Sequence, residues 1–310
     1  MDALRNNAER EIARLAATAR GAVGVAALHL ETGRALAYDA DASYPMASTV
    51  KVPLAVTVLA RAAAGRFDLA APVEVHPAEM NPSGPVSEEF RHGRVAMSPR
   101  ALLDSMITRS DNTATDVLLR LVGGPSAVQD HMRALGIDGI RVDRTIRELL
   151  LVLYALKDPG PSTSIYQALF GLGEEEMARR RARAAAPDPD YSRDPRDQAT
   201  PRAMLALLAK LHRAEGITPS NRDILLEIMS RTTTGLRRIR GRLPPGVAVA
   251  DKTGSACGTT NDAGLITLPH GAGTLALVVY IKESPLPVPD REDIIADIAR
   301  LAYDYAMLTA

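Results

Sequence analysis

The sequence lacks several features on which other classes of protein depend. Cys257 is the single cysteine among 310 residues, so neither an intramolecular disulfide nor a cysteine-rich zinc or iron–sulfur site can form. The formal net charge is zero, with 37 basic and 37 acidic residues. Because no net positive field is available to hold a polyanion, a nucleic acid or an anionic membrane is not an expected partner.

Long hydrophobic runs are also missing. No stretch approaches the roughly 18 consecutive apolar residues that a membrane span needs, and residues 1–20 interleave arginine and glutamate with short apolar steps. That segment predicts an amphipathic helix rather than a secretory signal peptide. We therefore expect a cytoplasmic protein with no membrane partner, although an exported chain whose leader had been removed would have the same sequence.

Metal-ligand spacing is absent as well. The six histidines follow no H-E-x-x-H or similar pattern, and they stand at positions 29, 76, 92, 131, 212 and 270. No metal and no other cofactor is expected. The composition is that of an ordinary globular protein, with 46% hydrophobic and 24% charged residues, which provides a sizeable core and excludes disorder as the main state.

The order of the predicted elements indicates an α+β fold. Helical spacing predicts helices at 48–64, 98–109, 113–122 and 290–307. Apolar runs bounded by turn residues predict strands at 21–30, 35–40, 246–254, 263–269 and 273–282. We expect one five-stranded antiparallel sheet completed by both chain ends. Residues 1–310 would form a single unit, in which 1–45 and 220–310 make the sheet lobe and 46–219 make a helical lobe.

Three short motifs concentrate the chemically useful side chains: Ser48-Thr49-Val50-Lys51, Ser110-Asp111-Asn112 and Lys252-Thr253-Gly254. The chain has only five lysines, and two of them fall in these motifs. Ser48 begins a predicted helix, and Lys51, three residues later, lies on the same face. A serine hydroxyl with an amine in reach is a nucleophile with a base, provided that burial or a neighbouring cation lowers the pKa of the amine.

Together, and in this order, the motifs resemble those of the penicillin-recognising serine acyl enzymes, most closely the class A β-lactamases. The resemblance covers roughly residues 10–147 and 192–305. It implies a β-lactamase/transpeptidase-like fold and a covalent acyl-enzyme at Ser48, with Lys51 as base and with Ser110 and Lys252 in proton relay. It also implies an oxyanion hole made by the backbone N–H groups of Ser48 and Ser255. Substrate contacts are implied for Asn112, Thr253, Gly254 and Ser255.

Each motif alone also has an ordinary structural interpretation. Ser48 could cap a helix beside a solvated Lys51, and residues 110–112 could be an interhelical turn. Lys252 could be a charge that protects an edge strand from aggregation. The presence of all three motifs, with family-like sequence on both sides of each, favours the catalytic interpretation.

The resemblance fails where class A β-lactamases hold the water that hydrolyses the acyl-enzyme. The family pattern E-x-x-L-N aligns so that Ile146 takes the glutamate position and Leu150 the asparagine position. Isoleucine cannot accept a proton, and an apolar pocket does not hold an ordered water. Glu148 is the nearest carboxylate, but placing it at the base position leaves no Leu-Asn pair after it.

The same loop also carries additional residues. In the family an Arg–Asp pair closes this loop, and the matching residues are Arg144 and Asp197, with 52 residues between them. Residues 147–157 and 164–186 predict helices, so the segment at about 148–191 is an inserted helical unit. It could be a flap beside or over the active site, or a solvated decoration with a basic face.

We therefore expect a serine acyl-transfer enzyme that acts on a carboxylate-bearing amide, ester or β-lactam and turns over β-lactams slowly. A transacylase or esterase acting on a cytoplasmic biosynthetic intermediate is the alternative within this class. A non-turnover β-lactam-binding or sensor protein is the alternative outside it. The expected partner is a small molecule, and we expect the chain to be a monomer.

Overall fold

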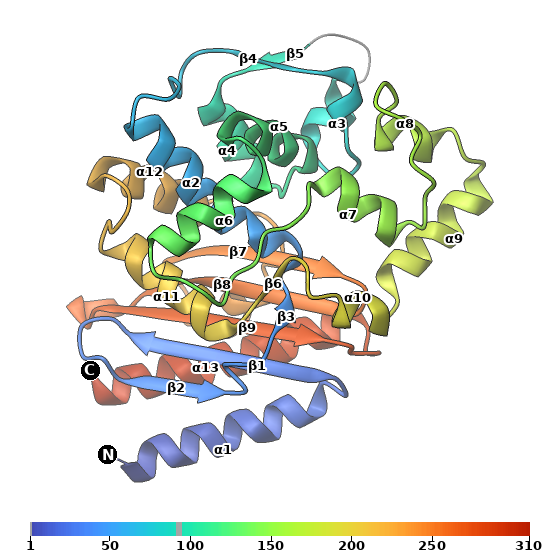
Figure 1. Ribbon diagram of the computed structural model, residues 1–310. Helices are drawn as coiled ribbons and strands as arrows, with labels where there is room; N and C mark the ends of the chain where they lie inside the picture. Colours follow the sequence, from blue (N-terminus) through green and yellow to red (C-terminus); the bar gives the residue numbers. More distant parts are fainter. Residues whose placement is uncertain (1, 91–94) are drawn as a thin grey trace.

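A five-stranded antiparallel sheet forms the centre of the computed structural model, which describes residues 2–90 and 95–310. The strand order is β2-β1-β9-β8-β7 (Figure 1). Both ends of the chain contribute, with β1 Ala22–His29, β2 Ala35–Tyr38, β7 Val249–Ala256, β8 Thr259–Thr267 and β9 Thr274–Lys282. The α+β fold expected from the sequence is confirmed.

Strand β9 shows why the sheet lies between two layers of helices. Successive side chains of a strand point to opposite faces, and in β9 both sets are apolar. Leu277 and Val279 pack in the core layer of α1 (Asp2–Thr18) and α13 (Val288–Thr309), whereas Val278 belongs to the core of the helical lobe. Both terminal helices therefore lie on one face of the sheet, and the helical lobe lies on the other (Figure 1).

The helical lobe is built around α2 (Lys51–Ala63), which is buried from Lys51 to Leu59. The helices packed around it are α4 Pro99–Thr108, α5 Asn112–Val122, α6 Pro125–Ala134 and α12 Pro219–Ser230, and α11 Pro201–His212 lies against the sheet. Shorter elements are β3 Tyr44–Pro45 with β6 Gln198–Ala199, β4 Val73–Val75 with β5 Val95–Met97, α3 Pro85–Glu89, and 3₁₀ turns at Ala47–Val50, Pro77–Glu79, Ile239–Arg242 and Pro269–Gly271. None of the described helices is long and apolar enough to cross a membrane.

The inserted segment folds into four short helices at one side of the molecule (Figure 1). They are α7 Ile146–Leu153, α8 Ile165–Phe170, α9 Glu174–Ala185 and α10 Pro189–Arg193. Their apolar side chains form a small core of their own, made of Ile146, Leu149, Leu150, Leu153, Ile165, Leu169 and Tyr191 together with Cys257. Because Cys257 lies in the β7–β8 turn, this core joins the insertion to the end of the sheet.

Strand β8 differs from the sequence prediction at its start. The predicted strand begins at residue 263, whereas the observed strand begins at Thr259 and includes the polar run Thr259–Asp262. These residues are nonetheless buried, and Asn261 Nδ2 donates hydrogen bonds to the carbonyl oxygens of Pro45 and Met46 at 2.7 and 3.1 Å. The polar side chain is satisfied by a distant segment, which hydropathy along the chain does not reveal.

Candidate active site

Ser48 lies in a tight turn between the sheet and the helical lobe. It belongs to the 3₁₀ turn Ala47–Val50 and not to α2 itself, which begins at Lys51. A Cβ atom at Gly254 of β7 would lie 2.7 Å from the Met46 carbonyl oxygen and 3.0 Å from the Ser48 backbone nitrogen. Glycine therefore allows the strand backbone to lie directly against the backbone of Ser48.

Lys51 is fully buried and joins the first two motifs. Its Nζ lies 3.2 Å from Ser48 Oγ, 3.0 Å from Ser110 Oγ, 2.6 Å from the Ser110 carbonyl oxygen and 2.8 Å from Asn112 Oδ1. Burial lowers the pKa of Lys51 well below its usual range, and the nearby cation of Lys252 lowers it further. A lysine with a depressed pKa, within reach of a serine hydroxyl, can take the proton of that hydroxyl.

The turn before α5 positions Ser110 and Asn112. Ser110 has a positive φ of 57°, a backbone conformation that needs support from its surroundings. Asp111 supplies it, because Oδ1 accepts from the Ala114 backbone N–H at 2.7 Å and Oδ2 accepts from the Val86 N–H at 2.7 Å. Asn112 Nδ2 donates to the Pro82 carbonyl oxygen at 2.9 Å, which leaves its second N–H for a ligand.

Strand β7 brings the third motif to the same place. Lys252 is fully buried, and its Nζ donates to the Thr253 carbonyl oxygen at 2.9 Å. Burial lowers the pKa of Lys252 to about 7, with a further contribution from the cation of Arg238. Thr253 Oγ1 lies 2.6 Å from Thr234 Oγ1. The three motifs, far apart in the sequence, thus meet at Ser48: Lys51 contacts its hydroxyl, and Gly254 lies against its backbone.

Arg238 is a site residue that sequence reasoning missed. Its guanidinium donates to Ser255 Oγ at 2.7 Å, to the Gly254 carbonyl oxygen at 3.1 Å and to Glu292 at 3.1 Å, and only 5% of the residue is exposed. It therefore fixes the end of β7 and adds a buried cation behind Ser255. The stretch Gly235–Arg240 holds three arginines, and nothing in their spacing distinguishes this one.

A pocket of about 320 Å³ opens beside Ser48. The described residues that line it are Ala47, Ser48, Ser83, Arg109, Ser110, Asn112, Ile146, Leu149, Leu150, Leu153, Tyr154, Ala184, Thr234, Ser255 and Ala256. None of these is aspartate or glutamate. The wall formed by α7 is apolar, since Ile146 and Leu150 line the pocket.

Glu148 does not face this pocket. Its carboxylate accepts hydrogen bonds from the Thr145 backbone N–H at 2.8 Å and from Thr145 Oγ1 at 3.0 Å, and Thr145 Oγ1 accepts from the Glu148 N–H at 3.1 Å. This is a reciprocal cap of α7. Asp116 holds the same helix end, because its carboxylate accepts from the N–H groups of Ile146 and Arg147 at 2.7 and 2.9 Å.

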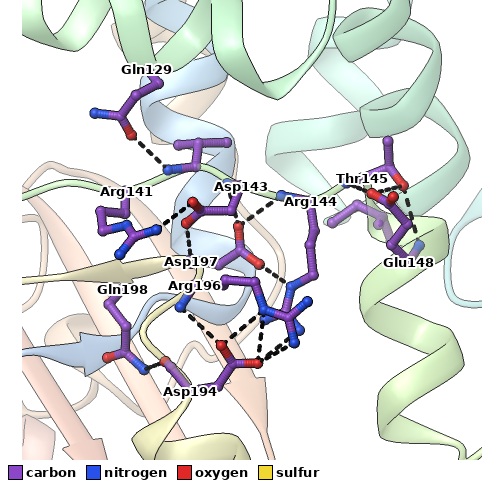
Figure 2. A network of polar contacts seen from close by, with 12 residues as sticks. Gln129, Arg141, Asp143, Arg144, Thr145, Glu148, Asp194, Arg196, Asp197 and Gln198 are labelled. Carbon is purple, nitrogen blue, oxygen red and sulfur yellow. Dashed lines mark hydrogen bonds and ion pairs between the residues drawn. The ribbon is translucent and has the colours of Figure 1, made fainter.

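The two ends of the inserted segment are clamped together (Figure 2). Arg144 Nε lies 2.6 Å from Asp197 Oδ2, and its Nη1 lies 3.2 Å from Asp194 Oδ2. Asp197 Oδ1 also accepts from the backbone N–H groups of Asp143 and Arg144. Hydrogen bonding from Arg196 lowers the pKa of Asp194 to about 2, so Asp194 is charged at neutral pH. The residues between the clamped ends can form additional helices without opening the loop.

Helix α9 reaches the opposite wall of the pocket. The backbone N–H groups of Cys257 and Gly258 donate to the carbonyl oxygens of Ala184 and Ala185 at 2.9 and 3.2 Å. Cys257 is buried, and burial raises the pKa of its thiol to about 11, so the thiol is not a nucleophile at neutral pH. Since Tyr154 and Ala184 line the Ser48 pocket, the insertion forms part of the site.

Comparisons with known proteins identify the family of this chain. A family model described as the β-lactamase enzyme family matches residues 7–306. The chain belongs to this family. It is 28% identical to the β-lactamase VEB-1 of Pseudomonas aeruginosa, over 91% of this chain and 85% of that protein.

Solved structures of the same family share the fold. A β-lactamase from Chitinophaga pinensis superimposes with a TM-score of 0.78 at 32% identity, covering 97% of this chain and 99% of that one. An ancestral class A β-lactamase also gives a TM-score of 0.78 at 32% identity, covering 96% and 99% of the two chains. The chain is therefore a serine β-lactamase-like hydrolase with the class A fold.

Metal ligands do not gather within residues 2–90 and 95–310, where no three His, Cys, Asp or Glu side chains could together hold a metal ion. His92, one of the histidines considered above, lies outside the described residues. The polar groups at the β-lactamase-like site are hydroxyls, amines, amides and guanidiniums.

Proposed function

We propose that the protein is a serine acyl enzyme in which Ser48 attacks a β-lactam, amide or ester that bears a carboxylate. The observation that carries this proposal is the 3.2 Å contact between Ser48 Oγ and the buried Lys51 Nζ. Burial and Lys252 lower the pKa of Lys51, so the neutral amine needed to accept the Ser48 proton is accessible near neutral pH.

The proposed reaction uses all three motifs. As Ser48 Oγ bonds to the substrate carbonyl carbon, its proton passes to Lys51, and the backbone N–H groups of Ser48 and Ser255 stabilise the oxyanion. The carbonyl–nitrogen or carbonyl–oxygen bond then breaks, and a proton reaches the leaving atom through Ser110, with Lys252 as the second member of the relay. Lys252 and Thr253 bind the substrate carboxylate, and Asn112 binds a substrate carbonyl.

The acyl group leaves this enzyme slowly in our proposal. Hydrolysis needs a water held and deprotonated beside the ester, and the described pocket wall offers Ile146 and Leu150 at the two positions concerned. An amine or alcohol that binds in the cleft would be a better acceptor than an unpositioned water. We therefore favour acyl transfer to such an acceptor, or slow hydrolysis, over rapid β-lactam hydrolysis.

Mass spectrometry tests the covalent step. Mixing the protein with benzylpenicillin at neutral pH should increase its mass by that of one penicillin, and proteolysis should map the added mass to the peptide that contains Ser48. A protein that binds penicillin without any change in mass, or that carries the adduct on another residue, would contradict the proposed nucleophile.

The acylation rate constant should have a bell-shaped pH profile. Lys51 must be neutral, so acylation falls as low pH protonates it. Lys252 must be protonated to attract a carboxylate, and since its pKa is about 7, kcat/KM should fall by up to about tenfold per pH unit above that value. The measurement is the second-order acylation constant of a penicillin between pH 5 and 9.

A matched variant tests whether Lys252 causes the fall in the acylation constant above pH 7. In Lys252→Arg the cation stays protonated throughout this range, so the fall above pH 7 should disappear even if the maximum rate is lower. With the methyl ester of the same penicillin, which has no carboxylate to attract, the fall above pH 7 should be smaller than with the free acid. An unchanged limb in both tests would show that Lys252 does not bind the carboxylate.

A further inference from the structure

A second pocket lies beside the Ser48 pocket. Its volume is about 240 Å³, and it is formed by α9, the β7–β8 turn and the first turns of α13. The two pockets share four lining residues, Tyr154, Ala184, Ser255 and Ala256. A substrate that is attacked by Ser48 can therefore extend into this second pocket along the end of β7.

Arg291 gives this pocket an unusual chemistry. Only 5% of the residue is exposed, and its Nε and Nη1 atoms are buried without a hydrogen-bond partner among the described residues. The other buried arginines differ, since Arg144 pairs with Asp194 and Asp197, and Arg238 pairs with Glu292. Buried cations in proteins are normally paired. The Glu292 carboxylate attracts the Arg291 guanidinium but forms its ion pair with Arg238, so Arg291 lacks a hydrogen-bonded anion among the described residues.

Three further features of the pocket favour an anion. Arg181 of α9 lines it and forms no ion pair with the described residues, and the Thr259 hydroxyl lining it is buried without a partner. The first turn of α13 contributes Val288, and no side chain caps that helix end. Unpaired N–H groups at the start of a helix attract negative charge. Burial and the cation of Arg238 also lower the pKa of Arg291, which an arriving anion would reverse.

We propose that this pocket, lined by Arg291, Arg181 and Thr259, is a second carboxylate-binding subsite that receives an acidic group on the acyl part of the substrate. The inference rests on the proposed function, because it assumes that the acyl group is attached at Ser48. Lys252 and Thr253 bind one carboxylate, and the second pocket lies roughly 10 Å farther along β7, at a rise of about 3.3 Å per residue. The substrate class is thus a dianionic amide or ester whose reactive carbonyl lies between its two acidic groups.

A pair of substrates that differ by one carboxylate tests the subsite. Benzylpenicillin and its 4-carboxybenzyl analogue share the reacting ring, and the acylation constant of each is measured by stopped flow or mass spectrometry. We expect the acidic analogue to acylate the parent protein at least about tenfold faster than benzylpenicillin. A ratio near one in the parent protein would overturn the proposal.

Three variants test which residues cause the faster acylation by the acidic analogue. Arg181→Ala changes an exposed residue and should lower the ratio of the two constants by about threefold or more, and Arg291→Gln should bring it near one. Arg183→Ala removes a neighbouring exposed arginine of α9 that does not line the pocket, and it should keep the parent ratio. If Arg291→Gln does not fold, the comparison of Arg181→Ala with Arg183→Ala decides. Equal ratios in those two variants would overturn the proposal.

Binding of unreactive fragments separates this proposal from the proposed function. Calorimetric titration with 4-carboxyphenylacetate and phenylacetate requires no acylation. We expect at least about tenfold tighter binding of the diacid to the parent protein, and a preference that is lower by about threefold or more in Arg181→Ala. Equal affinities for the two fragments would contradict the subsite, whereas a missing adduct with both penicillins would contradict the acyl-enzyme alone.

Discussion

Replacing Ser48 by alanine is expected to lower the second-order acylation constant by at least about 10³-fold, because removal of the nucleophile from a catalytic unit leaves only binding and oxyanion stabilisation. No covalent adduct should be detected by mass spectrometry after mixing with benzylpenicillin. The fold should survive, since among the described residues Ser48 Oγ has one side-chain hydrogen bond, to Lys51 Nζ, and Lys51 keeps its bonds to Ser110 and Asn112.

The control for this variant is Ser43→Ala. Ser43 is exposed and lies outside the Ser48 pocket, so its variant should acylate like the parent protein. The same experiment separates an enzyme from a binding or sensor protein. If the parent protein forms no adduct and Ser48→Ala binds penicillin with unchanged affinity, the chain binds its ligand without reacting.

The second large effect concerns release of the acyl group. In the parent protein we expect one equivalent of penicillin to react quickly and the adduct then to persist, because no described carboxylate lines the Ser48 pocket. Positioned general bases contribute about 10²–10⁴-fold. Acylation should therefore exceed deacylation by at least about 10²-fold, seen as a burst of product with a chromogenic cephalosporin. Rapid turnover without a persistent adduct would contradict this expectation.

Restoring the missing groups should reverse this behaviour. The double variant Ile146→Glu/Leu150→Asn places a base and an amide on the wall of α7, and deacylation should accelerate by about 10²-fold. Ile146→Gln/Leu150→Asn is the matched control, because it adds polar groups that can hold water but supplies no base. The midpoint of thermal unfolding of both variants measures the loss of stability caused by polar groups in the small core of the inserted segment. Equal deacylation rates in the two variants would show that position 146 is not where the water is activated.

The inserted segment, from α7 to α10, packs against the end of the sheet at the β7–β8 turn. The sequence predicts helices between Arg144 and Asp197, and the structure has α7, α8, α9 and α10 between these two residues. Whether it lines the cleft depends on hydrogen bonds between α9 and the β7–β8 turn, such as Cys257 N–H to the Ala184 carbonyl oxygen. Backbone hydrogen bonds of this kind leave no pattern of residue types. The sequence alone therefore favoured neither an active-site flap nor a solvated decoration as the role of the insertion.

The sequence by itself determined the fold class and supplied the candidate reactive residues, because both depend on local patterns. Apolar runs at the two chain ends indicated five strands, and three motifs named Ser48, Lys51, Ser110 and Lys252. The predicted loss of the deacylation pair also comes from the sequence, because Ile146 and Leu150 follow Arg144 at the family spacing.

The tertiary structure decided everything that depends on contacts between distant segments. It showed that Lys51 is buried, that Arg238 lies behind Ser255, and that polar Asn261 is satisfied inside a strand. It also revealed that Arg291 is buried and that its Nε and Nη1 atoms have no hydrogen-bond partner among the described residues. Burial and the distances between charges set pKa values and ligand preference, and both are properties of the folded chain rather than of any segment of it.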